Sequence, residues 1–112
     1  MAIPSGSGSE RLRRATLHSN GGATEILSGT AGHLYTILSI TAADQSGADT
    51  TIEFRVNDGS NDVKILAAQV LPANGSFVWD NVFVMEEDDD LDVNNTGVDC
   101  DWYLSYIDQD WT

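Results

Sequence analysis

The densest group of side chains able to hold a metal ion is the acidic run 86–92. Aspartates stand at its alternate positions, which are Asp88, Asp90 and Asp92. Their hard oxygens suit Ca²⁺, but the EF-hand loop does not fit, because counting from Asp88 puts Val93 where that loop requires glycine. Blocks of like charge are usually solvated. The run is therefore interpreted as an exposed acidic loop, with a calcium site as the weaker alternative.

Residues suited to nucleophilic or acid–base catalysis are few and scattered. Cys100 stands between Asp99 and Asp101, whose negative field disfavours the reactive thiolate, so it is predicted to be a small core residue. His18 and His33 have no His, Cys or acidic residue at ligand spacing. The sequence also lacks a nucleophile elbow, a phosphate-binding glycine loop and a dinucleotide fingerprint. It predicts no enzyme and no cofactor.

Arginines are concentrated near the start of the chain. Residues 1–14 contain Glu10 and the three arginines Arg11, Arg13 and Arg14, a net charge of +2, so a formal total of −13 leaves −15 for the remainder. The Gly/Ser-rich opening predicts a flexible basic arm over residues 1–13. Its arginines are predicted to bind carboxylates of an acidic partner or of a neighbouring copy. The alternative is a strand edge protected by charge.

The acidic remainder argues against several classes of partner. Eleven carboxylates and no Lys or Arg lie between Asp80 and Asp110, which would repel a phosphate backbone, so nucleic-acid binding is not expected. No export signal and no apolar run long enough to cross a membrane is visible. A single cysteine fits synthesis in a reducing cytoplasm.

Alternating apolar residues separated by Gly, Asn, Asp and Ser clusters predict an all-β chain. The expected strands cover about residues 12–18, 24–27, 32–43, 50–57, 62–70, 77–85 with a bend at 80–81, 91–93 and 99–108. The 32–43 strand is apolar on both faces and is placed mid-sheet. In the 62–70 strand, Val63, Ile65 and Ala67 are expected to share one face. About eight such strands predict a single antiparallel β-sandwich, jelly-roll-like, over residues 14–112.

The tryptophans divide into two groups. Trp79 and Trp102 lie within alternating strands and are predicted to be core residues, although exposed aromatics on a sandwich could stack on sugars. Trp111 follows the last expected strand. It is expected either to fold back onto the domain or to enter a neighbouring subunit.

The two termini resemble those of small virion structural proteins of tailed bacteriophages. The similar segments are Ile3-Pro4-Ser5-Gly6-Ser7-Gly8-Ser9-Glu10 before the basic segment, and Ser105-Tyr106-Ile107-Asp108-Gln109-Asp110-Trp111-Thr112 at the end. The resemblance implies a capsid decoration, or cement, protein. Such a protein is a β-sandwich, often trimeric, that lies on the outer capsid surface. It binds the major capsid protein and holds neighbouring capsomers together.

On this hypothesis the chain is made in the host cytoplasm and becomes part of the virion. The residues expected to bind partners are Ile3, Arg11, Arg13, Arg14 and Trp111. One alternative is a component of the tail or of the head–tail connector. Another is a carbohydrate- or calcium-dependent binding module using exposed aromatics or the 86–92 carboxylates.

Overall fold

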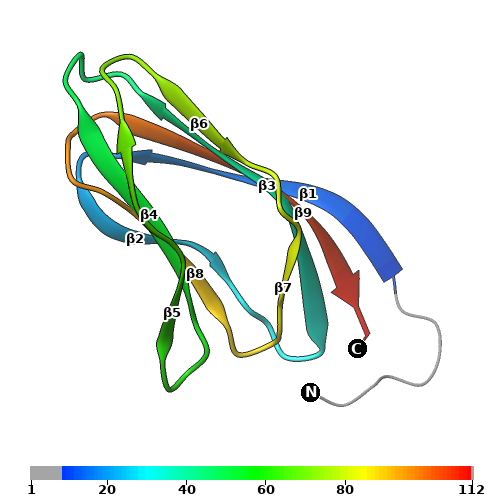
Figure 1. Ribbon diagram of the computed structural model, residues 1–112. Helices are drawn as coiled ribbons and strands as arrows, with labels where there is room; N and C mark the ends of the chain where they lie inside the picture. Colours follow the sequence, from blue (N-terminus) through cyan, green and yellow to red (C-terminus); the bar gives the residue numbers. More distant parts are fainter. Residues whose placement is uncertain (1–8, 112) are drawn as a thin grey trace.

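A computed structural model describes residues 9–111 as two antiparallel sheets packed face to face (Figure 1). Its nine strands are β1 (Ser9–Ser19), β2 (Gly22–Ser28), β3 (His33–Asp44), β4 (Thr50–Asn57), β5 (Asp62–Leu71), β6 (Ser76–Trp79), β7 (Phe83–Met85), β8 (Asp90–Asn95) and β9 (Cys100–Asp110). The first sheet has the order β1-β9-β3-β6, with β7 also paired to β3, and the second has the order β2-β8-β4-β5. The predicted antiparallel sandwich is confirmed. Within the described part, no helix is long and apolar enough to cross a membrane.

The first strand begins earlier than the sequence indicated. β1 pairs with β9 along its whole length, from Ser9 opposite Asp110 to Ser19 opposite Cys100. Residues 9–13, expected to belong to the flexible arm, are therefore part of the sheet. The rest of that arm, including Ile3, lies outside the described residues. Regular pairing of the basic segment follows from the alternation of Leu12 with its charged neighbours, which suits a pleated edge strand.

The central position predicted for the 32–43 segment is confirmed, because β3 has β9 on one side and β6 and β7 on the other. The bend expected at residues 80–81 is also present. It separates β6 from β7, and these two short strands pair with successive parts of β3. Dividing this segment in two gives nine strands instead of about eight.

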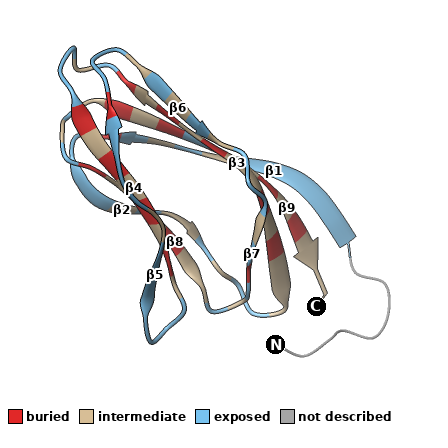
Figure 2. Ribbon diagram, in the orientation of Figure 1, coloured by how far each residue is buried: buried red, intermediate tan, exposed pale blue. Residues whose placement is uncertain are grey.

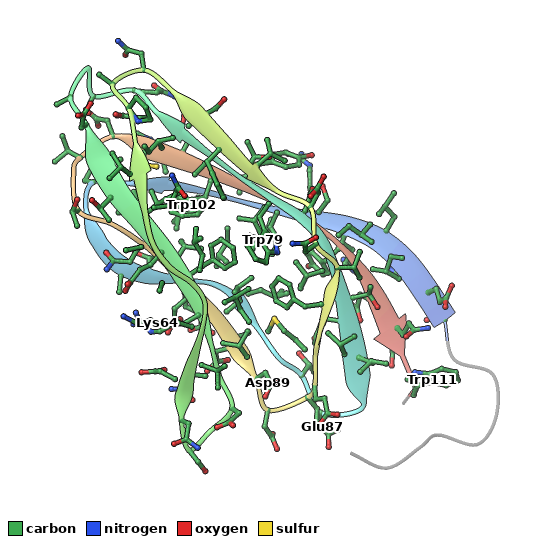
Figure 3. The ribbon with its side chains drawn as sticks, viewed as in Figure 1. Lys64, Trp79, Glu87, Asp89, Trp102 and Trp111 are labelled. Atoms are coloured by element: carbon green, nitrogen blue, oxygen red, sulfur yellow. The ribbon has the colours of Figure 1, made fainter. Side chains whose placement is uncertain are left out.

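The core lies between the sheets, where the red buried segments of both layers face inward (Figure 2). In β4 every second residue is buried, as the alternation predicted, and Ile52 and Phe54 are fully enclosed. From the first sheet, Trp102 is 2% exposed, and Trp79 contacts Phe54 edge to face at 5.4 Å between ring centroids. Both tryptophans point between the sheets (Figure 3), so their predicted core role is confirmed.

The prediction for β5 is wrong in detail. Ala67 is exposed on the outer side, whereas Ile65 and Leu66 both pack against the core. The cause is a double register shift against β4, which places Leu66 opposite Phe54. Val63 keeps its predicted side, opposite the buried Val56, but it is 49% exposed near the start of this edge strand. A bulge of this kind turns adjacent residues toward the same side and breaks strict alternation.

Candidate interaction surfaces

The two outer faces of the sandwich differ sharply in charge. The outer face of the second sheet carries an ion-pair network in which Glu53 contacts Arg55 and Lys64, each at 3.3 Å. Arg55 also lies 3.8 Å from Asp92. A hydrogen bond from Asn94, with the nearby cations adding to it, lowers the pKa of Glu53. This face is solvated and highly charged.

The outer face of the first sheet carries two rows of uncharged side chains. Register and alternation place one row across it, formed by Leu12, Ile107, Thr36 and Val84. The second row is formed by Thr16, Tyr103, Thr41 and Val78. Between the rows lie two charged residues, Arg14 on β1 and the exposed Asp80 at the bend between β6 and β7. Beyond the rows, at the ends of the face, Glu10 accepts a hydrogen bond from Gln109, and Asp101 contacts His18. We call this surface the uncharged face, after its two uncharged rows.

A shallow hollow of about 340 Å³ opens on the uncharged face. Its walls and floor include Thr16, His18, Thr41, Ala43, Asp101 and Tyr103. The Tyr103 ring is 42% exposed, and Leu12, Val78 and Val84 are more than half exposed. Sequence reasoning missed this surface, because it is assembled from five strands whose register the sequence does not state.

The three arginines expected to bind partners do not act alike. Arg13 lies at the open end of the sandwich, where its Nε atom is 3.3 Å from the Asp108 carboxylate. Asp108 is nearly buried, so Arg13 is used within the domain. Arg11 and Arg14 are exposed and have no ion pair among residues 9–111. Of the three, these two remain available to a partner.

Both histidines contact aspartates of β9, which corrects the prediction that they stand alone. His33 Nδ1 lies 2.7 Å from Asp108 Oδ1, and its ring stacks on Tyr35. His18 Nδ1 lies 2.5 Å from Asp101 Oδ1, and its Nε2 is 3.4 Å from Asp99. The hydrogen bond to Asp101 raises the pKa of His18. These partners are more than 70 residues away in sequence, so only the β1–β9–β3 pairing reveals them.

The acidic run forms a tight loop at one end of the sandwich, with Glu87 and Asp89 labelled in Figure 3. Its backbone approaches Gly29 so closely that a Cβ atom there would lie 2.6 Å from the Glu87 carbonyl oxygen. The Glu87 carboxylate accepts a hydrogen bond from the Gly32 backbone N–H at 2.8 Å. The loop is thus held by the β2–β3 connection.

The candidate calcium ligands are not brought together. Asp88 is exposed in the loop, Asp90 accepts a hydrogen bond from Ser28, and Asp92 faces Arg55. Among residues 9–111, no three His, Cys, Asp or Glu side chains converge as a metal site would require. Beside the loop, residues 58–61 and 86–89 surround an acidic hollow of about 370 Å³. Its negative charge would attract a basic segment.

Cys100 is fully buried, and desolvation, assisted by the charge of Asp44, raises the pKa of its thiol to about 11. Its predicted core position is confirmed. Trp111 is partly buried, and its backbone N–H donates to the Gly32 carbonyl at 2.9 Å. This hydrogen bond extends the β3–β9 pairing by one step, to the β2–β3 connection.

No protein-family model matches the chain, and no curated protein matches it in sequence. Solved structures share its fold. A chain from the acid-stable capsid structure of Helicobacter pylori bacteriophage KHP30 aligns with a TM-score of 0.59 and 9% identity, covering 98% of this chain and 92% of that one.

Two other structures are similar. A chain of the T13 IBDV viral particle aligns with a TM-score of 0.56 and 11% identity over 91% of this chain, which spans 31% of that longer one. A chain from the disulfide-linked pili of Bacillus endospore appendages gives a TM-score of 0.53 and 13% identity, covering 99% of this chain and 96% of that one. At these identities the likeness is one of fold.

Proposed function

We propose that the chain is a non-enzymatic structural protein of a phage virion, which decorates the outer capsid surface and stabilises it by contacts with the major capsid protein and with neighbouring copies. The observation that carries the proposal is the division of its surface into one largely uncharged sheet face and one highly charged face. A subunit on a shell needs a face that contacts its neighbours and a face that stays solvated. The end-to-end likeness of its fold to a chain in the KHP30 capsid supports this reading.

The side chains able to do chemistry support a non-enzymatic role. The Cys100 thiol is buried with a pKa near 11, so it is neither accessible nor ionised at neutral pH. The two histidines are each held by aspartates. Within the described residues, no Ser, Thr or Cys side chain is hydrogen-bonded to either histidine.

The arginine contact proposed for the shell rests on Arg11, near the start of β1, together with the segment that precedes β1 and includes Ile3; Arg14 lies mid-strand on the uncharged face. Trp111 lies at the same end of the molecule as the start of β1 (Figure 3). We propose that Arg11 and Trp111 belong to one contact region of basic and aromatic character. Such a region fits a shell protein that presents carboxylates beside an apolar pocket.

Immunogold electron microscopy of the intact particles tests the proposal. Antibodies raised against the purified chain should label the shell evenly. Label confined to the tail or the neck would support the tail or connector alternative, and no label on intact particles would contradict a surface position. As a matched comparison, antibodies against the major capsid protein should give the same distribution.

A further inference from the structure

We propose that the uncharged face of the first sheet is the surface through which copies of this chain bind one another. The partner is a second copy of the chain. The β1 side of the sheet in each copy lies against the β6–β7 side of the sheet in the other copy. The inference deepens the proposed function, on whose contact between neighbouring copies it rests, and it can be tested on the free protein without a capsid.

Charge identifies a second copy as the occupant. With a net charge of −13, two copies repel each other in most orientations. Along the two uncharged rows they can meet without apposing carboxylates, because Glu10 and Asp101 lie beyond these rows, at the ends of the face. Its exposed apolar residues are Leu12, Tyr103, Val78 and Val84, while Thr16, Thr36 and Thr41 are small enough to receive them.

The area is sufficient for a specific contact. β1 and β9 have 11 residues each, so the face is about 35 Å long, and its four strands make it about 19 Å wide. Two copies in contact over most of it would bury about 1,000 to 1,300 Å², at the lower end of stable interfaces. We expect association at micromolar concentrations instead of an inseparable complex.

When the two faces pack with their strands aligned, large side chains lie opposite small ones. A two-fold axis along the strands puts β9 of one copy over β3 of the other. Tyr103 then lies opposite Thr41, which lines the hollow, and Leu12 lies opposite Val84.

The same alignment pairs the remaining charge. Arg14 lies on the β1 side of the face. At the same position along the strands, the other side of the face is formed by the bend between β6 and β7, where Asp80 is exposed. Each contact between copies thus brings the free Arg14 guanidinium near Asp80 of the neighbour. Complementary edges of this kind fix the register of an interface more than its strength.

Sedimentation velocity across a concentration series tests the inference. The wild-type chain should move from 12.1 kDa to a multiple of that mass as concentration rises. Val78→Asp on the uncharged face should remain monomeric. Val70→Asp is the matched control, since Val70 on β5 is also 59% exposed and the charge change is the same, so it should associate like the wild type. Circular dichroism should show both variants folded.

A monomer at every concentration up to hundreds of micromolar would overturn the inference, as would equal effects of the two substitutions. Charge exchange tests the register: Arg14→Asp and Asp80→Arg should each raise the dissociation constant about tenfold or less, and the double variant should recover it. If both single variants associate more weakly and the double variant does not regain the wild-type dissociation constant, the proposed edge pairing is wrong. A chain that is monomeric in solution yet labels the shell would refute this interface and leave the decoration proposal standing.

Discussion

The indole Nε1 of Trp102 donates a hydrogen bond to the amide Oδ1 of Asn95 at 3.1 Å, linking the two sheets inside the core. Asn95 is fully buried at the end of β8, and its Nδ2 donates to the Gly97 carbonyl at 2.7 Å. Both polar groups of the Asn95 amide are therefore satisfied in the β8–β9 turn. Buried polar groups that are fully paired help select one arrangement of a core.

Asn95→Ala should lower the free energy of unfolding by about 2 to 3 kcal/mol, because it leaves the Trp102 N–H buried without its acceptor and opens a small cavity. Urea denaturation followed by tryptophan fluorescence measures the loss. Asn81→Ala is the control, since Asn81 is exposed and accepts from Trp79 through its backbone oxygen, which the substitution retains. It should change stability by less than about 0.5 kcal/mol. Equal losses in both variants would contradict the role given to Asn95.

The open end of the sandwich depends on Asp108, which contacts both Arg13 and His33. Asp108→Ala should destabilise the domain by about 1 to 2 kcal/mol, because hydrogen bonds to charged groups are lost and a nearly buried site is left partly empty. Asp88→Ala removes the same charge from an exposed loop position and should have little effect. If both variants melt at the wild-type temperature, the Arg13–Asp108 contact adds nothing to stability.

His18 makes stability depend on pH. The hydrogen bond to Asp101 raises its pKa in the folded protein above that of the unfolded chain, so its contribution is fully present below about pH 6.5 and is lost as pH rises through the higher folded value. Thermal melts between pH 5 and 9 should show this decline. His18→Gln should flatten it, and Asp101→Asn should lower the His18 titration midpoint in an NMR experiment. An unchanged midpoint in Asp101→Asn would show that another group sets it.

The sequence was sufficient for the elements that rest on local pattern. Alternation predicted β4 to the residue, and the two apolar faces of residues 32–43 placed β3 mid-sheet. It failed where partners far along the chain decide the outcome. Arg13 was expected in a free arm, but β9 offers it a complete strand edge and Asp108. The bulge that turns Ala67 away from the core arises from the β4–β5 register, which residue types alone do not specify.

The same reason explains what could be foreseen of the binding surfaces. The basic cluster was visible because Arg11, Arg13 and Arg14 are adjacent in sequence. The uncharged face was not, because its residues come from β1, β9, β3, β6 and β7 and become neighbours only through pairing. His18 and Asp101 likewise meet across 83 residues. Which distant strands pair with one another cannot be read from a single β-protein sequence.

The boundary of the N-terminal arm leads to a last prediction, which compares two truncations. Removing residues 1–8 leaves every described contact of β1 in place, so the domain should remain folded. Removing residues 1–14 also deletes the pairs from Ser9–Asp110 to Arg14–Ser105 and the Arg13–Asp108 contact. This longer deletion uncovers half of β9 and should lower the urea midpoint strongly.

The shorter truncation is therefore the one that isolates the arm. In a sedimentation assay with capsids stripped of this protein, removal of residues 1–8 should weaken binding to the capsid. The urea midpoint of unfolding should shift no more than it does for a typical surface substitution. Arg11→Ala should weaken binding further and make it less sensitive to salt, because screened ion pairs are lost. The matched variant Lys64→Ala removes the same charge from the second sheet. If that variant weakens binding as much, the effect is one of net charge, and the proposed contact at the start of β1 is wrong.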